Sequence, residues 1–302
     1  MKLLITGASG FIGKNFLSYI EDNHLLDLMD IILLSSKCDG SHICVPHNNY
    51  NFTKEDFLSQ GITEINVVLH LGAFTPKCGS QADNIQLSFS NIKNTLHLLQ
   101  NLPAKPNKIV FISTLDVYSD SSIIDEETMP NPSSLYGWSK LFCEKLISQY
   151  AKENGIDYQI LRIGHIYGPG EENYQKLIPL TICRILNNED PVIFTDGSEL
   201  RSFLYIFDCC KAIWKAITLT EMPGPINIVS KHGESVKNIV KLLIDISGKK
   251  LSIQILNQPI QTRDLLFNAD KMEHYLCHEA ENLKSGLEKE FNYMKLLYSQ
   301  KD

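Results

Sequence analysis

The sequence lacks long apolar runs, clusters of basic residues and metal-type cysteine spacings. No stretch of about 20 apolar residues is present, and Met1–Ile5 leads into a glycine-rich turn without a signal-peptide core. We therefore expect no membrane insertion and a cytoplasmic protein. Lys and Arg number 28 against 35 Asp and Glu, for a net charge of −7. Because nucleic-acid binding needs clustered cations, this balance argues against a nucleic-acid partner.

The cysteines include no Cys-x-x-Cys and no cysteine–histidine spacing of the kind that binds metal. We expect reduced thiols that serve mainly in packing, and no metal site. The adjacent pair Cys209–Cys210 is expected to pack within a helix rather than to carry redox chemistry. The eight cysteines occupy positions 38, 44, 78, 143, 183, 209, 210 and 277.

The amino terminus carries the first motif with a chemical meaning. Residues 2–6 are apolar, Gly7-x-x-Gly10-x-x-Gly13 follows, and 14–20 is amphipathic, which predicts a strand, a glycine turn and a helix. A tight turn without a ligand is the plain alternative. Its place directly after the first strand favours a dinucleotide site, in which the helix amino end and close backbone accommodate a pyrophosphate. The residues expected to line this turn are Gly7, Ser9, Gly10, Phe11, Ile12 and Gly13.

A second strand at 31–34 ends where a dinucleotide site often has an acidic residue for the ribose hydroxyls. Here the sequence reads Ser35, Ser36 and Lys37 instead. Two hydroxyls and an ammonium suit a 2′-phosphate, so we favour NADP over NAD as the cofactor. If Lys37 is only a solvated loop residue, the cofactor preference is lost but the dinucleotide site is not.

Two further apolar strands are expected at 66–74 and 108–114. The first runs into the small residues of Leu71–Ala73, which would let the backbone pass beside a cofactor. The second ends in Ser113 and Thr114, at the carboxyl edge where doubly wound sheets bind ligands. Thr114 is therefore a candidate to hydrogen-bond a reacting carbonyl, although a lone Thr after a strand more often caps a turn.

Tyr136 and Lys140 are four residues apart at the start of a predicted helix, so they share one face. A nearby ammonium stabilises a phenolate and lowers its pKa, which would make Tyr136 an acid/base near neutral pH. Taken alone, such a pair is more often a surface Tyr stacked on a Lys. The dinucleotide turn before it and the hydroxyl-tipped strand favour the chemical interpretation.

A fifth strand at 158–163 runs into a loop at 164–170, after which the pattern becomes less regular. The predicted fold class is α/β, a Rossmann-type doubly wound parallel sheet with a smaller mixed α/β substrate-binding domain. The dinucleotide-binding domain is expected at 1–165 with a returning segment near 191–220, and the smaller domain at 166–190 and 221–302. Further strands are expected at 192–194, 202–206 and 251–256, and helices at 84–101, 208–219, 234–247 and from about 281.

Four motifs in order resemble the extended short-chain dehydrogenases/reductases, in the branch of nucleotide-sugar epimerases and dehydratases. They are the glycine turn, Ser113-Thr114 before Tyr118, Tyr136-x-x-x-Lys140, and Arg162 followed by Tyr167-Gly-Pro. The resemblance extends from Met1 to about residue 245. It implies that Tyr136 is the acid/base, that Lys140 binds the nicotinamide ribose and that Thr114 holds the sugar oxygen. The other implied contacts are Leu71, Gly72 and Ala73 for the cofactor, and Thr75, His165 and Arg201 for the substrate, with Arg201 on the diphosphate.

Two departures from the family pattern bear on function. His165 stands where the family has an asparagine; it still offers a hydrogen-bond donor to a sugar or phosphate, but it is also the only titrating group in that loop. Dehydratases of this branch carry Asp-Glu directly after the Thr, whereas this chain has Leu115-Asp116. Because one carboxylate of the pair is absent, we disfavour dehydration.

These residues favour an NADPH-dependent reductase of a nucleotide-linked 4-keto-sugar, in which Tyr136 delivers the proton. The closest alternative is a nucleotide-sugar 4-epimerase with tightly bound NAD, and a catalytically silent nucleotide-binding protein is a more remote one. The resemblance also suggests a homodimer joined through helices near 84–101 and 137–152. No motif names the sugar or the nucleotide base.

Overall fold

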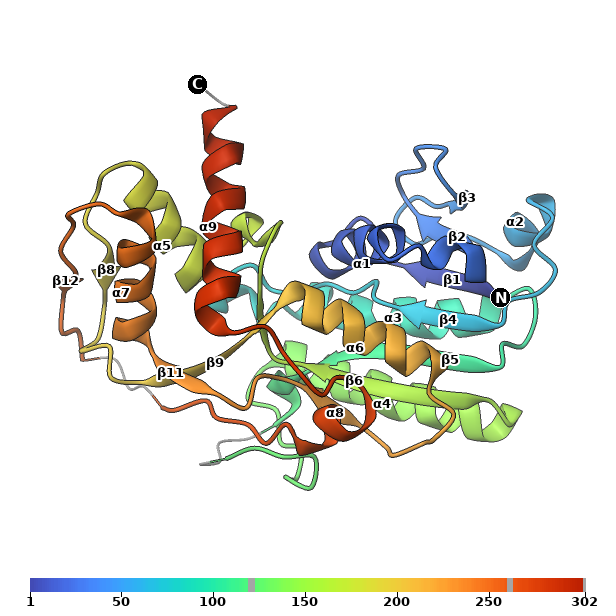
Figure 1. Cartoon of the computed structure of the whole chain (residues 1–302). Helices are drawn as coiled ribbons and strands as arrows, with labels where there is room; N and C mark the ends of the chain where they lie inside the picture. The colour runs from blue at the N-terminus through green and yellow to red at the C-terminus, as the bar shows by residue number, and fades with distance from the viewer. Residues whose placement is uncertain (119–122, 260–262, 301–302) are drawn as a thin grey trace.

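A seven-stranded, wholly parallel sheet forms the centre of the molecule in the computed structural model, which describes residues 1–118, 123–259 and 263–300 (Figure 1). The strand order is β10-β6-β5-β4-β1-β2-β3. Successive strands β1 to β3 are added toward one edge of the sheet and β4 to β6 toward the other, so the strand order reverses between β1 and β4. The strands are β1 (Lys2–Thr6), β2 (Asp30–Ser35), β3 (Ile43–Pro46), β4 (Val67–His70), β5 (Lys108–Thr114), β6 (Asp157–Ile163) and β10 (Ile226–Ile228). Ligands of such sheets bind at the carboxyl edge beside that reversal.

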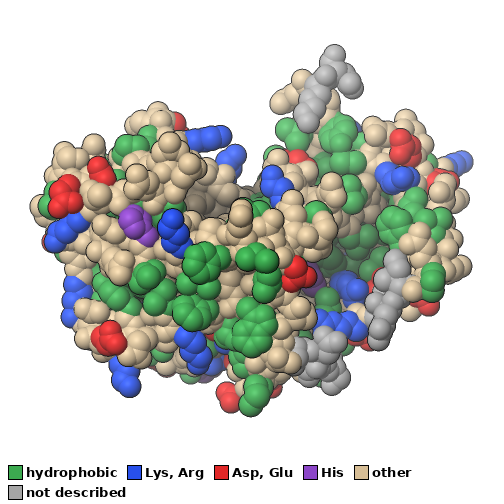
Figure 2. Space-filling model, turned by 180° about the vertical axis from the view of Figure 1, so that it is seen from behind, with side chains coloured by type: hydrophobic (Ala, Val, Ile, Leu, Met, Phe, Trp, Pro, Cys, Tyr) green, Lys and Arg blue, Asp and Glu red, His purple; other side chains and the backbone are tan. Residues whose placement is uncertain are grey.

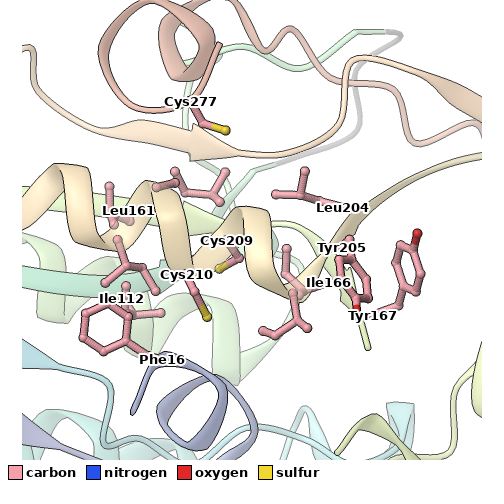
Figure 3. Packing of buried hydrophobic residues seen from close by; sticks show 14 of the residues in the cluster. Phe16, Ile112, Leu161, Ile166, Tyr167, Leu204, Tyr205, Cys209, Cys210 and Cys277 are labelled. Carbon is pink, nitrogen blue, oxygen red and sulfur yellow. The ribbon is translucent and has the colours of Figure 1, made fainter. Parts of the chain in front are cut away.

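Helices cover both faces of the sheet, which explains why β4 and β5 are buried along their whole length. α1 (Phe11–Asp22) and α6 (Ile206–Thr218) lie on one face, and α2 (Lys54–Ser59), α3 (Ile85–Asn101) and α4 (Leu135–Asn154) lie on the other. Cys209 and Cys210 of α6 are fully buried against the sheet among apolar side chains (Figure 3). The expectation that they serve in helix packing is confirmed.

A smaller part of the molecule lies beyond the carboxyl edge and holds two short sheets, β11-β9-β7 and β12-β8. The carboxyl-terminal helix α9 packs against α5 and α7 there. The strands are β7 (His165–Tyr167), β8 (Val192–Ile193), β9 (Leu200–Tyr205), β11 (Gly233–Ser235) and β12 (Gln254–Ile255). The helices there are α5 (Leu177–Leu186), α7 (Val236–Ser247) and α9 (Leu283–Ser299), whereas α8 (Asp270–Tyr275) packs against β10 of the large sheet. Short 3₁₀ turns are η1 (Leu25–Leu28), η2 (Gly79–Gln81), η3 (Leu115–Val117) and η4 (Glu171–Asn173).

The fold class predicted from the sequence is confirmed, and the strand at 108–114 coincides with β5. The loop expected at 164–170 instead contains β7, which pairs with β9 about 40 residues further on. β10 lies within the range 221–302, yet it pairs with β6 in the large sheet. The division of the chain into domains stays a prediction.

One pair of cysteines differs from expectation. Cys38 and Cys44 form a disulfide, because the loop between β2 and β3 brings their Cα atoms within 5.9 Å. The other six cysteines are free thiols. Within the described residues there is no group of three or more His, Cys, Asp or Glu side chains that could hold a metal ion. No helix in that part of the chain is long and apolar enough to cross a membrane.

Candidate active site

The glycine turn after β1 lies against the segment that follows β4. Gly7 has φ +72°, and a Cβ there would lie 2.6 Å from the backbone nitrogen of Gly72, so only glycine fits. A Cβ at Gly13 would overlap the backbone of the turn itself. At Gly10, by contrast, a Cβ would meet only one atom, the carbonyl oxygen of Gly7 at 3.2 Å. Gly7 and Gly13 therefore shape the turn, and Gly10 leaves room beside it.

The amino end of α1 fits a dinucleotide pyrophosphate. Gly10 is its N-cap residue, and no side chain caps the exposed N–H groups of the first turn. Ser9 and Gly10 are exposed, whereas Phe11 and Ile12 are half-buried and Gly13 is buried. Asn15 Nδ2 donates to the carbonyl oxygen of Pro169 at 2.8 Å, which ties the loop after β7 to this helix. The residues present therefore suit a bound NAD(P).

The end of β2 has the polar composition that the sequence indicated. Ser35 is buried and its Oγ accepts the backbone N–H of Lys37 at 3.1 Å. Ser36 and Lys37 are exposed. The Asp39 carboxylate accepts the backbone N–H and the hydroxyl of Ser41 at 3.0 and 2.6 Å, so it is engaged within its own loop.

A buried histidine that the sequence analysis did not identify supports the backbone at Leu71–Ala73. His70 Nδ1 lies 2.7 Å from Thr6 Oγ1, and His70 Nε2 lies 3.0 Å from Thr95 Oγ1. Thr6 Oγ1 also accepts the backbone N–H of Gly72 at 2.9 Å. Burial, assisted by the charge of Lys140, lowers the pKa of His70 to about 3, so it is a neutral hydrogen-bonding link between β1, β4 and α3. No spacing in the sequence signals such a link.

Tyr136 lies in the first turn of α4, where Ser134 caps the helix by accepting the backbone N–H of Gly137 at 3.1 Å. The phenol is buried, and the neighbouring hydroxyls of Thr75 and Thr114 act to lower its pKa. The structure therefore brings together Thr75, Thr114 and Tyr136, which lie in three separate segments of the sequence. Burial is the largest cause that raises the pKa of Tyr136, followed by the negative charge of Asp116.

Lys140 is also buried on the same face of α4, one turn after Tyr136, but its ammonium lies 4.3 Å from the ring centroid of Phe111. Burial lowers the pKa of Lys140 to about 8. The four-residue spacing predicts that Lys140 lowers the pKa of Tyr136. The pKa is raised instead, because burial of the phenol and the charge of Asp116 outweigh any such effect.

Cationic and acidic side chains lie together on the other side of the site, where the Lys176 ammonium is 3.6 Å from the buried Glu171 carboxylate. Arg201 Nη1 donates to the backbone oxygen of Arg263 at 2.6 Å, and to that of Leu200 at 2.8 Å. His165 has no hydrogen-bond partner at Nδ1, and burial together with the charges of Lys176 and Arg201 lowers its pKa to about 4. His165 is thus a neutral imidazole at pH 7. Lys176 and Arg263 were not identified from the sequence, because no motif marks them.

A buried ion pair lies behind the strand end that carries Thr114. The Arg162 guanidinium donates to both carboxylate oxygens of Glu144 at 3.0 and 2.8 Å. Ser113 Oγ donates to the same carboxylate at 2.5 Å, and Arg162 Nη1 donates to the Tyr118 hydroxyl at 2.6 Å. Bidentate pairing of this kind fixes two elements relative to each other. It holds α4, β5 and β6 together next to Thr114 and Tyr136.

The parallel sheet, the glycine turn at its carboxyl edge and the Tyr136–Lys140 pair on α4 place the chain among the extended short-chain dehydrogenases/reductases. Residues 3–229 match the NAD dependent epimerase/dehydratase family, and the chain belongs to that family of enzymes.

An uncharacterized UDP-glucose epimerase of Bacillus subtilis (strain 168) is 30% identical over 316 residues, which are 99% of each chain. The structure of UDP-glucuronic acid 4-epimerase from Bacillus cereus with UDP-glucuronic acid and NAD is similar, with a TM-score of 0.84 at 27% identity over 99% of this chain and 100% of that one. The structure of RMD from Pseudomonas aeruginosa complexed with NADPH shares the fold, with a TM-score of 0.83 at 22% identity, covering 98% of this chain and 99% of that one. The fold therefore does not choose between the two cofactors.

Proposed function

We propose that this chain is an NAD(P)-dependent oxidoreductase that acts on the sugar ring of a nucleotide diphosphate sugar. The observation that carries the proposal is the meeting of the Tyr136 phenol with the hydroxyls of Thr75 and Thr114 at the carboxyl edge of the sheet. Tyr136 is assigned as the acid/base and Thr114 as its partner at the reacting oxygen. Lys140 is assigned to the nicotinamide ribose. The nicotinamide, when bound, exchanges a hydride with the sugar carbon.

Arg201 is assigned to the diphosphate of the substrate. A guanidinium matches phosphate geometry, which supports Arg201 as the diphosphate contact. A neutral His165 offers hydrogen bonding without charge, so we assign it to a sugar or ribose hydroxyl rather than to phosphate. Leu115 next to Asp116 leaves a single carboxylate after Thr114, so dehydration is disfavoured.

The residues at the end of β2 favour a reductase, which would reduce a 4-keto-sugar with NADPH. Ser35 to Lys37 offers hydroxyls and an ammonium to a 2′-phosphate and no carboxylate to a ribose diol. A 4-epimerase with tightly bound NAD is the second candidate. It is supported by the names of relatives similar to this chain, a UDP-glucose epimerase and a UDP-glucuronic acid 4-epimerase.

Purified protein distinguishes these two forms. The reductase is expected to leave purification without bound dinucleotide and to consume one NADPH for each nucleotide-linked 4-keto-sugar reduced, as followed by absorbance and product analysis. Tightly bound NAD, together with interconversion of two nucleotide sugars without added cofactor, would contradict the reductase and support the epimerase. A thermal-shift panel of nucleotide sugars identifies the substrate to use, since ligands stabilise the folded state.

Lys37→Ala is expected to weaken NADPH binding by roughly 10-fold to 150-fold, because an ionic hydrogen bond to the 2′-phosphate contributes about 1.5–3 kcal/mol. NADH affinity should change less than about twofold. Isothermal titration calorimetry with both cofactors measures this difference. Lys54→Ala, an exposed lysine on α2, is the control. Equal losses for both cofactors in the Lys37 variant would refute the assignment to the 2′-phosphate.

We also propose that the chain forms a homodimer through α3 and α4. The face that these helices present to solvent is apolar and lies across the middle of the view in Figure 2. Its most exposed large side chains are Ile85, Phe89, Trp138 and Phe142. Burying such a face stabilises association by the hydrophobic effect. The assigned cytoplasmic location stays a prediction.

Phe142→Asp is expected to convert the dimer to a monomer in sedimentation velocity, because it would bury a carboxylate in an apolar interface. Phe194→Asp is the matched control, since Phe194 has the same exposed fraction as Phe142, 55%, but follows β8 on the smaller part of the molecule. A wild-type protein that sediments as a monomer at micromolar concentration would contradict the interface.

A further inference from the structure

A disulfide lies directly beside the residue assigned to the 2′-phosphate. Cys38 follows Lys37 and is joined to Cys44, which lies opposite Leu33 in the pairing of β2 with β3. The two Cα atoms are 5.9 Å apart, and the sequence separation of the cysteines is 6 residues. The bridge therefore ties the chain just after Lys37 to β3, the outermost strand of the large sheet.

The bridged pair is more accessible than most of the other cysteines. Cys38 is exposed and Cys44 is half-buried, whereas Cys143, Cys209 and Cys210 are fully buried. The stabilisation that a disulfide provides falls as the loop that it closes shortens, and this loop is short. A chain of 302 residues also buries a large core without such a link. An accessible, short-range bridge of this kind suits thiol–disulfide exchange better than structural cross-linking.

The loop between the two cysteines forms hydrogen bonds among its own residues. Asp39 Oδ1 accepts the backbone N–H and the hydroxyl of Ser41 at 3.0 and 2.6 Å. The Ser41 hydroxyl also lies 2.9 Å from His42 Nδ1. A Cβ at Gly40 would meet nothing within 4 Å, so the loop extends into open space. These bonds shape the loop but do not attach it to the sheet, which the disulfide does.

Lys37 lies between two attachments. Its backbone N–H donates to Ser35 Oγ at the end of β2, at 3.1 Å, and the residue after it is held to β3 by the bridge. We propose that Cys38 and Cys44 form a thiol–disulfide switch that controls NADPH binding, in which the disulfide form holds Lys37 in place for the 2′-phosphate. This inference rests on the proposed function, since it uses the assignment of Lys37. NADPH binds more tightly to the disulfide form, because binding does not then have to order this segment.

The chemistry of the switch is thiol–disulfide exchange. A dithiol reductant breaks the bond between Cys38 and Cys44. Two electrons and two protons pass to the cysteines, which become thiols, and the dithiol becomes a disulfide. Glutathione disulfide reverses the change, because it accepts two electrons and leaves as two glutathione thiols while the Sγ–Sγ bond forms. Cys38 is exposed, so such reagents reach its sulfur from solvent.

The test is calorimetric titration of the full-length protein with NADPH and with NADH, after treatment with either glutathione disulfide or dithiothreitol. Peptide mass spectrometry after alkylation identifies the state of the two cysteines in each sample. The disulfide form should bind NADPH about 3-fold to 10-fold more tightly than the dithiol form, the range expected when one long side chain is ordered in advance. The affinity for NADH should change by less than about twofold between the two forms, because NADH has no 2′-phosphate.

Three variants separate the switch from other effects of oxidation. Cys44→Ser should bind NADPH as the dithiol form does after both treatments. Lys37→Ala should lose the dependence on redox state, because the residue that the bridge holds is then missing. Cys78→Ser removes a half-buried free cysteine outside the bridge and should retain the dependence.

Equal NADPH affinity of the two wild-type forms would overturn the proposal, as would failure of glutathione disulfide to form the bond between Cys38 and Cys44 in the folded protein. The wild-type comparison needs no variant, so it decides even if a substitution prevents folding. NADPH binding that depends on Lys37 but not on redox state would refute the switch alone. NADPH binding that does not depend on Lys37 would refute the proposed cofactor assignment, and the switch with it.

Discussion

Tyr136→Phe is expected to reduce turnover by about 100-fold to 10,000-fold, the range that a positioned acid/base contributes to a proton-transfer step. The phenol is buried and adjoins the hydroxyls of Thr75 and Thr114, so a phenylalanine occupies the same space but can neither donate nor accept the proton. Cofactor affinity should change by less than about threefold, because Lys140 and the glycine turn are unaltered. Steady-state kinetics and calorimetric titration with the cofactor measure the two effects separately.

Tyr150→Phe is the matched control for that experiment. Tyr150 lies on the same helix, nearly four turns beyond Tyr136, and packs with the cluster on the face of the sheet covered by α3 and α4. Loss of its hydroxyl should leave turnover within about twofold of the wild type. Unchanged activity in Tyr136→Phe would refute the acid/base assignment. A parallel loss of cofactor affinity would indicate that the phenol acts in binding rather than in proton transfer.

The parts of this site that the sequence predicts are those fixed by local spacing. A side chain at Gly7 would collide with the backbone of Gly72, and one at Gly13 would collide with the backbone of the turn itself. Both positions therefore require glycine, and the spacing of these glycines can be recognised in the sequence. Tyr136 and Lys140 share a helix face because they are four residues apart. Thr114 ends a strand whose seven residues are all buried, so its place at the carboxyl edge follows from the apolar run before it.

The parts that could not be predicted depend on contacts between distant segments. The first turn of α4 rests on η3 because Gly137 has no Cβ to meet the carbonyl oxygen of Asp116, and no pattern in either segment specifies that contact. Lys176 and Arg263 reach the site from loops whose course is set by the small sheets of the carboxyl-terminal part. Short strands such as β7 and β10 have three residues each, too few for a periodic signal to emerge.

The direction of the pKa shift at Tyr136 shows how such contacts alter chemistry. Spacing alone pairs the phenol with a cation and predicts a lowered pKa. In the folded chain the Lys140 ammonium lies over the Phe111 ring, and burial of the phenol, followed by the charge of Asp116, raises its pKa. The assignment of Tyr136 as the acid/base stays a prediction, and the direction of its pKa shift is set mainly by burial, which spacing along the sequence does not reveal.

Glu144→Ala is expected to lower the free energy of unfolding by about 3–5 kcal/mol, because it leaves the buried Arg162 guanidinium without its counter-charge. The side chains of both residues are only 4–5% exposed, and the carboxylate also accepts the Ser113 hydroxyl. Urea unfolding measures the change, provided that the denaturant slope matches that of the wild type. The variant should also lose turnover at temperatures where it remains folded, since the pair joins α4 to the strand that carries Thr114.

Glu153→Ala is the control, because Glu153 is an exposed carboxylate at the end of the same helix. Removing it should change the free energy of unfolding by less than about 0.5 kcal/mol. Replacing Glu144 and Arg162 together by methionine should recover much of the stability lost in the single variant, since neither buried charge then remains unpaired. The double variant should keep its turnover defect if the ion pair aligns Thr114 with Tyr136. Full activity there would mean that the pair stabilises the fold without positioning the site.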